Sequence, residues 1–253
     1  MSKDLTQALA DYREGKMVIV TDHEGRENEA DLVMAAEFAD QEKIAFMIRY
    51  TSGIMCVALT EDRARELQLP QMVANNQDKK STAFTVSVDY KVGLTTGISA
   101  SERASTIVSL ASPTTKSIDL IRPGHVFPLV AHKNLLKSRL GHTEAAVVLS
   151  MLTGHQQVGV ISELVNDDGT MKQVAVTDLK TYVGGVPSTI LTPGMIDLES
   201  YGAGSGYSKI KKGGWNRPAI QLDEGAVSQI GVNIPVPSAY TPDGSQIEIK
   251  ILY

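Results

Sequence analysis

The residues best suited to chemistry lie in one short acidic stretch, residues 22–31 (DHEGRENEAD). Five carboxylates and one arginine, Arg26, share these ten positions. The stretch directly follows the apolar run 17–20, which predicts a buried strand. Like charges this close together repel, so water, a cation or Arg26 must offset the repulsion. We therefore expect a loop at the end of a core strand that is either simply solvated or binds a cation.

A second candidate surrounds His142. Thr143 is the predicted N-cap of a helix over residues 144–153. A helix N-terminus presents free N–H groups that favour phosphate, and Arg139 adds a guanidinium suited to phosphate oxygens. The same residues also suit an ordinary helix start with a surface histidine and arginine, and the local sequence does not separate the two interpretations.

Glu27 and His142 together would give a divalent cation only two protein ligands. Magnesium commonly keeps several waters and takes further oxygens from its substrate, so a sparse set of this kind suits it. The sequence contains no CxxC, HExxH or His-x-His pattern, which leaves a zinc site without support.

The other reactive or glycine-rich positions favour structural roles. Cys56 lies in an apolar run and is expected in the core, whereas His132 and His155 flank loops and are expected at the surface. Glycines within residues 202–206 lack the preceding strand and following helix of a nucleotide-binding loop. The basic cluster in residues 209–217 is expected to be a solvated loop rather than an RNA contact.

Composition limits the class of protein. The chain has 253 residues, of which 42% are hydrophobic and 21% are charged, as in an ordinary globular protein with a sizeable core. A net charge of −5 gives no bulk attraction to nucleic acid or anionic membranes. The start has no apolar signal segment, no run of 18 apolar residues occurs, and the single cysteine cannot form an intrachain disulfide. We expect a cytoplasmic enzyme with no nucleic-acid or membrane partner.

Hydrophobic spacing predicts helices and strands in irregular alternation, which is typical of an α/β (α+β) fold with a mixed β-sheet layered with helices. Asp40, Thr60 and Ser99 are predicted helix caps, the last with Glu102 three residues on in a capping box. Predicted helices cover residues 3–14 and 144–153, follow the caps at 40, 60 and 99, and alternate with predicted strands at 17–21, 54–59, 83–89, 126–130 and 158–161.

The composition changes near Gly184. About half of the 21 glycines and the only tryptophan lie beyond it, and helical periodicity is absent there. Ile247, Ile249 and Ile251 alternate with charged residues as in a one-sided strand. We predict a catalytic domain over residues 1–183 and a small glycine-rich, β-rich extension over residues 184–253 that packs on it.

Residues 1–183 resemble the 3,4-dihydroxy-2-butanone 4-phosphate synthase family of riboflavin biosynthesis. The resemblance is carried by seven blocks in the family's order: 26–31 (RENEAD), 49–56 (RYTSGIMC), 82–88 (TAFTVSV), 95–100 (TTGISA), 122–128 (RPGHVFP), 141–145 (GHTEA) and 166–171 (NDDGTM). It implies an α/β sandwich, a homodimer, and a lyase that converts D-ribulose 5-phosphate to L-3,4-dihydroxy-2-butanone 4-phosphate and formate. The implied cofactor is Mg²⁺, with Mn²⁺ as an alternative.

The resemblance also implies roles for individual residues. The implied metal ligands are Glu27 and His142. Those implied as catalytic are His125, Glu163, Glu29 and Asp31. Those implied to bind the substrate are Arg26, Glu27, Asp31, Arg139, Leu140, Gly141, His142, Thr143 and Glu163.

Three departures from the family pattern stand out. Ala30 replaces a glycine and Ser162 replaces a cysteine. The helix of roughly 15 to 20 residues that the family has after the NDDGTM block is missing, and the extension beyond Gly184 has no recognised counterpart. A relative acting on another sugar phosphate, and a catalytically silent sugar-phosphate-binding protein, therefore stay open as alternatives, although a binding protein has no need of Glu27, His125, His142 and Glu163 together.

Overall fold

The structure, a computed structural model, describes residues 3–21 and 26–172, together with the backbone of five two-residue strands nearer the C-terminus. Residues 22–25 of the acidic stretch and residues 173–188 lie outside the described residues. The place after the NDDGTM block where the family helix is missing therefore falls outside them, and so does most of the predicted extension.

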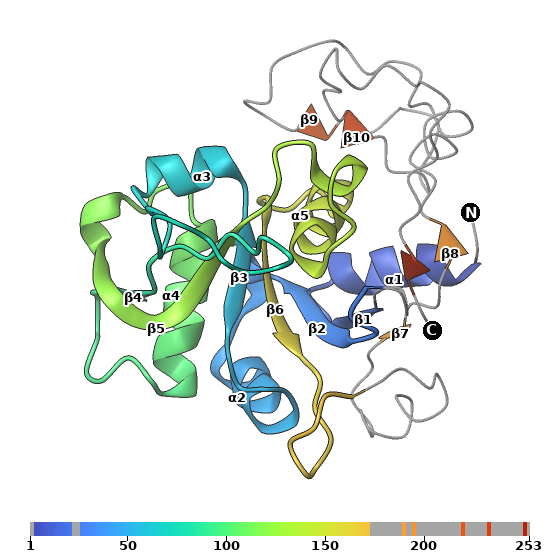
Figure 1. Cartoon of the computed structure of the whole chain (residues 1–253), viewed down its shortest axis with the longest axis horizontal. Helices are drawn as coiled ribbons and strands as arrows, with labels where there is room; N and C mark the ends of the chain where they lie inside the picture. The colour runs from blue at the N-terminus through green and yellow to red at the C-terminus, as the bar shows by residue number, and fades with distance from the viewer. Residues whose placement is uncertain are drawn as a thin grey trace.

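A seven-stranded mixed sheet forms the centre of the molecule, in the order β4-β5-β3-β6-β2-β1-β7 (Figure 1). β3 pairs with β5, and β1 with β7, in parallel, and the other neighbours are antiparallel. The mixed sheet predicted from the sequence is thus confirmed. The strands are β1 (Val18–Thr21), β2 (Ala30–Ala35), β3 (Cys56–Leu59), β4 (Val88–Tyr90), β5 (Leu120–Val130), β6 (Val158–Glu163) and β7 (Thr189–Ile190).

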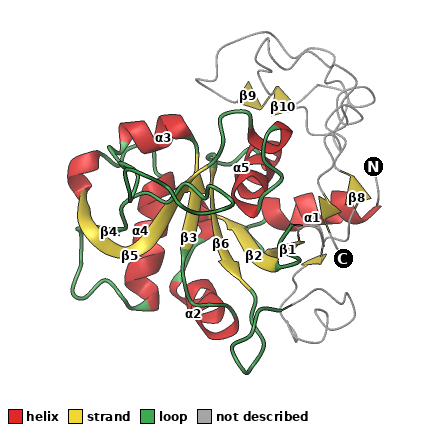
Figure 2. Cartoon of the chain, in the orientation of Figure 1, coloured by secondary structure: helices red, strands yellow, loops and turns green. Residues whose placement is uncertain are grey.

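Helices cover both faces of the sheet (Figure 2). Side chains of α1 and α5 pack on one face, and side chains of α2 and α4 pack on the other. Alternate strand residues serve the two layers, so that Val18 and Val20 face α1 and α5 while Ile19 faces the opposite layer. The helices are α1 (Lys3–Arg13), α2 (Gln41–Tyr50), α3 (Glu61–Glu66), α4 (Ala100–Ala111) and α5 (His142–Thr153), with 3₁₀ turns η1 (Ala36–Phe38), η2 (Ser117–Asp119) and η3 (Leu135–Lys137).

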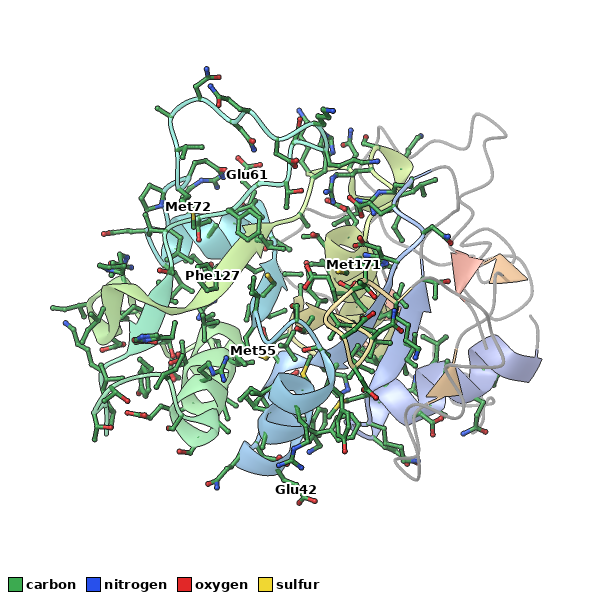
Figure 3. All side chains as sticks on the ribbon, turned by 60° about the horizontal axis from the view of Figure 1, so that its bottom comes forward. Glu42, Met55, Glu61, Met72, Phe127 and Met171 are labelled. Carbon is green, nitrogen blue, oxygen red and sulfur yellow. The ribbon has the colours of Figure 1, made fainter. Side chains whose placement is uncertain are left out.

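Burial follows this layering. Met55 is fully buried beside α2, whereas Glu42 and Glu61 lie on the outside of the molecule (Figure 3). Helix α5 is buried along its whole length. Within the described part of the chain, no helix has both the length and the apolar character needed to cross a membrane.

The predicted helix caps are largely confirmed. Asp40, Thr60 and Ser99 each accept a hydrogen bond from the backbone N–H three residues on, and Gly154 ends α5 in the left-handed conformation. The prediction for Thr143 was wrong, because the N-cap of α5 is Gly141 and His142 is already the first helical residue.

Other sequence predictions need correction. The predicted strand 83–89 is mostly irregular, since only its end belongs to β4 and Phe84 and Thr85 make isolated bridges. Strand β2 was not predicted, because its first two residues belong to the acidic stretch and all six of its residues are buried, without alternation. Asp31 therefore lies in a strand and not in a loop. The side chain of His155 is only 14% exposed and packs edge-on against Phe38, so its expected place at the surface was wrong.

Candidate active site

Two carboxylates face each other across neighbouring strands. Asp31 of β2 lies directly opposite Glu163 of β6 in the antiparallel register. Such residues point to the same face of the sheet, with Cβ atoms about 4.5–5.5 Å apart. The Ser52 hydroxyl donates a hydrogen bond of 2.8 Å to Glu163 Oε2. Because Val33 and Ile161 on the same two strands face α5, the carboxylate pair faces α5 as well.

Helix α5 begins over this pair. The Nδ1 atom of its first residue, His142, is 3.4 Å from Asp31 Oδ1, and the exposed fractions of the two side chains are 9% and 3%. The partial positive charge of a helix N-terminus favours anions at this point. The structure therefore joins one predicted metal ligand to one predicted catalytic carboxylate.

The segment leading into α5 is fixed by a buried ion pair. Arg139 Nη1 donates a hydrogen bond of 2.7 Å to Glu144 Oε2, and the backbone N–H of His132 donates one of 2.9 Å to Glu144 Oε1. A Cβ atom at Gly141 would come within 2.4 Å of Arg139 Nη1, so the pair leaves no room for a side chain there. Neighbouring Thr143 is buried, while the side chain of Leu140 is exposed.

A chain of contacts connects this segment to the acidic loop. Arg139 Nε donates to the backbone oxygen of Lys80 at 3.4 Å, and Lys80 Nζ donates to the backbone oxygen of Arg26 at 3.1 Å. The Arg26 guanidinium is itself paired with the carboxylate of Glu27. Glu29, which follows this pair in the sequence and precedes β2, is partly buried. Arg26, Glu27 and Arg139 are thus linked through residue 80, far from all three in the sequence.

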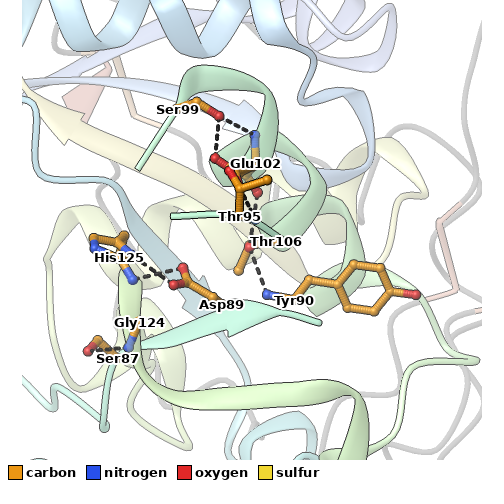
Figure 4. Close-up of polar contacts among 9 residues, drawn as sticks. All are labelled: Ser87, Asp89, Tyr90, Thr95, Ser99, Glu102, Thr106, Gly124 and His125. Atoms are coloured by element: carbon orange, nitrogen blue, oxygen red, sulfur yellow. Dashed lines mark hydrogen bonds and ion pairs between the residues drawn. The ribbon is translucent and has the colours of Figure 1, made fainter. Parts of the chain in front are cut away.

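His125 makes a separate pair with an aspartate (Figure 4). Its Nδ1 atom is 2.7 Å from Asp89 Oδ2, and its backbone N–H donates a hydrogen bond of 2.9 Å to Asp89 Oδ1. A carboxylate only accepts, so His125 Nδ1 carries the hydrogen and Nε2 is left to act on other groups. The exposed fractions are 40% for the histidine side chain and 5% for the aspartate.

The sheet register relates His125 to the carboxylate pair. Cys56 of β3 is paired with Phe127 on one side and with Ile161 on the other. His125 and Glu163 each lie two residues from this row, toward the same end of the sheet. His125, Glu163 and its partner Asp31 therefore lie toward the same end of the sheet.

Cys56 lies in the core near this end of the sheet, as predicted. Burial raises the pKa of its thiol well above the usual range, and the nearby charges of Glu163 and Asp31 raise it further. A thiol held in its protonated form is a poor nucleophile. The reactive groups of the site are therefore its carboxylates and histidines.

Comparison with known proteins identifies the family to which this chain belongs. The family model described as 3,4-dihydroxy-2-butanone 4-phosphate synthase matches residues 6–183. The enzyme of that name from Candida albicans is 54% identical over 171 residues, which make up 67% of this chain and 84% of the relative. The chain belongs to the 3,4-dihydroxy-2-butanone 4-phosphate synthase family.

Further relatives agree with this membership, and the chain is an enzyme of this type. A crystal structure of a 3,4-dihydroxy-2-butanone 4-phosphate synthase in complex with two magnesium ions matches with a TM-score of 0.64 and 46% identity, over 65% of this chain and 77% of that one. The riboflavin biosynthesis protein RibBA of Salinispora arenicola is 49% identical over 197 residues, 78% of this chain. The chain spans about half the length of that relative (46%).

The side chains present suit the magnesium chemistry of such a synthase. Among the described residues, no three His, Cys, Asp or Glu side chains form a ready group of metal ligands. A magnesium ion does not require one, because it commonly completes its shell with water and substrate oxygens. One carboxylate and one imidazole, from Glu27 and His142, fit such a shell.

Three partners in the synthase site were not predicted from the sequence: Asp89, Glu144 and Ser52. Glu144 and Ser52 lie inside the family blocks 141–145 and 49–56, and Asp89 directly follows the block 82–88. Their position in or beside these blocks was the available signal. Their partners lie 5 to 111 positions away in the sequence, so only the folded chain assigns the pairs.

Proposed function

We propose that the chain converts D-ribulose 5-phosphate to L-3,4-dihydroxy-2-butanone 4-phosphate and formate, the lyase step that supplies a riboflavin precursor. The observation that supports it best is the contact of Asp31 with His142 and its cross-strand pairing with Glu163, within a chain of this synthase family. Enolisation of a ketose phosphate needs a base, a proton carrier and a binding site for anionic oxygens. Each of these has candidates at this end of the sheet.

Glu27 and His142 would hold Mg²⁺, or Mn²⁺ in its place. When bound, the cation stabilises negative charge that develops on substrate oxygens. The relative solved with two magnesium ions supports this assignment. Arg26 is paired with Glu27 in the structure, so a change of partner at Glu27 would leave its guanidinium to bind the substrate.

The proton steps fall to the remaining residues. Asp31, Glu163 and Glu29 are the candidate bases for removing a proton from the carbon next to the carbonyl. His125 presents Nε2, since Nδ1 is held by Asp89, and can carry a proton during dehydration and rearrangement near neutral pH. Arg139 and residues 140–143 would bind the phosphate beside the N-terminus of α5.

The direct test is to incubate the purified protein with ribulose 5-phosphate and Mg²⁺ and to assay formate. We expect turnover that EDTA abolishes and that Glu27→Gln eliminates with an unchanged melting temperature. Glu42→Gln, which removes an exposed carboxylate elsewhere, should retain full activity. Undiminished activity in EDTA or in Glu27→Gln would refute the metal assignment. Formate from a different ketose phosphate would identify a divergent relative, and binding without turnover would identify a silent one.

The proposal extends to a homodimer in the cytoplasm with no nucleic-acid or membrane partner, as the family resemblance implies. Light scattering of the purified protein should give twice the mass of 27.2 kDa. A monomeric mass with full activity would contradict the dimer. Cell fractionation tests the location.

We also propose that residues 184–253 pack on the catalytic domain. The backbone of Thr189–Ile190 (β7) pairs with Val18 and Ile19 at the edge of the sheet, and Lys250–Ile251 (β11) pairs with Gly194–Met195 (β8). An uncovered sheet edge favours aggregation. Truncation after Gly184 should therefore lower the melting temperature and the solubility. A truncated chain that stays soluble and active, with an unchanged melting temperature, would show that the extension is independent.

A further inference from the structure

The Asp89–His125 pair is covered by the turn that precedes α4, residues 95–99. Gly97 in this turn is buried and has a φ angle of +81°. A Cβ atom there would lie 2.3 Å from Asp89 Oδ2 and 2.6 Å from His125 Nδ1. The backbone of the turn therefore rests directly on the hydrogen bond between the two side chains.

One carboxylate holds this turn in place. Glu102 Oε1 accepts hydrogen bonds from the backbone N–H of Thr95 at 2.6 Å and from its hydroxyl at 2.8 Å. Glu102 Oε2 accepts one of 2.7 Å from the Ser99 hydroxyl (Figure 4). These bonds, with a further one from the Gly97 backbone, lower the pKa of Glu102 to about 2, so the carboxylate stays charged at neutral pH.

The same face of α4 also holds the strand that carries Asp89. Thr106, four residues after Glu102, accepts a hydrogen bond of 3.0 Å from the backbone N–H of Tyr90. Residues four apart lie on one side of a helix. The turn above the pair and the strand below it are therefore both fastened to α4.

We propose that Glu102 is a positioning residue for His125: by holding residues 95–99 against Asp89, it fixes the tautomer and orientation of the imidazole. Glu102 need not touch the substrate for this role. The inference builds on the proposed function, because it concerns the histidine assigned there to proton transfer.

Kinetics and NMR of the full chain test this role together. Glu102→Ala should lower kcat by about 10- to 100-fold, as small displacements of a reacting group do, with little change in KM. The ¹⁵N shifts of His125 should move toward a mixture of tautomers. Glu102→Gln keeps one oxygen for Thr95 and should recover part of both readouts. Glu66→Ala, which removes an exposed carboxylate from α3, should leave both unchanged.

Gly97→Ala provides a second variant in case Glu102→Ala folds poorly. Its methyl group would displace the Asp89–His125 pair while Glu102 stays intact, so the same NMR change is expected. Unchanged His125 shifts in either folded variant would overturn the proposal. The NMR readout needs no turnover, so a failure of the formate assay would refute the proposed function and leave this test standing.

Discussion

The two histidines of the site each lie beside an aspartate but in opposite settings. The His125 side chain is 40% exposed, and its ring is held by a short 2.7 Å contact with Asp89. The His142 side chain is 9% exposed, and its contact with Asp31 is longer, at 3.4 Å. The first ring is locked at one nitrogen and open at the other, whereas the second is enclosed at the start of a helix.

This difference is consistent with the separate roles proposed above for the two histidines. A ring with one fixed nitrogen and one accessible nitrogen is suited to carrying protons. A buried imidazole beside a carboxylate is suited to help bind a cation, and the helix N-terminus favours the anionic oxygens that accompany it. The surroundings differ as well, since His125 is held by two hydrogen bonds to Asp89, and the segment before His142 is held by the Arg139–Glu144 ion pair.

The largest expected effect is a loss of kcat when the Asp89–His125 pair is disrupted. Asp89→Asn replaces the acceptor of the Nδ1 hydrogen with an amide that can donate, which favours the wrong tautomer of His125. We expect kcat to fall by about 10²–10⁴-fold, the usual contribution of a general acid–base group. The control Asp62→Asn, which removes an exposed carboxylate from α3, should be neutral. Full activity of Asp89→Asn in the formate assay would remove His125 from the chemistry.

An intermediate effect is expected on stability near His142. Glu144→Gln leaves the Arg139 guanidinium, only 19% exposed, without its charge partner. Breaking a buried pair in this way costs on the order of 3 kcal/mol of unfolding free energy. Denaturant titration measures it, with Glu66→Gln as the control, because it breaks the more exposed pair with Arg63. Equal stability of the two variants would show that the Arg139–Glu144 pair does not hold this segment.

The smallest expected effect is on substrate binding, and it tests whether Arg139 contacts the phosphate. Arg139→Ala removes the proposed charge-assisted hydrogen bond to the substrate, so binding should weaken by about 1.5–3 kcal/mol, mainly as a higher KM. It also leaves the buried Glu144 carboxylate without its charge partner, so KM is measured on the folded fraction. Lys133→Ala removes an exposed cation from the same segment and should leave KM unchanged. If Arg139→Ala bound unphosphorylated ribulose and ribulose 5-phosphate in the same ratio as the unaltered chain, Arg139 would not contact the phosphate.

Local features of this protein could be predicted from its sequence. Asp40, Thr60 and Ser99 were identified as helix caps because each bonds to the backbone only three residues away. The predicted end of the helix at residue 153 also agrees with the structure, where Gly154 adopts the left-handed conformation that glycine readily takes. The acidic stretch was identified from its charge pattern, His125 and His142 lie in the motif blocks, and Glu163 was named through the family resemblance. The mixed sheet was predicted from the alternation of elements.

Which side chains contact each other depends on the folded structure. Asp31 pairs with Glu163 because β2 and β6 are antiparallel neighbours in a particular register, and a shift by one residue would turn one of the two to the opposite face. Asp89 meets His125 across 36 positions of sequence. Pattern analysis identifies a strand from its own residues, but the register between strands depends on packing of the whole sheet against its helices. Sequence therefore supplied the candidate residues, and the fold assigned their partners.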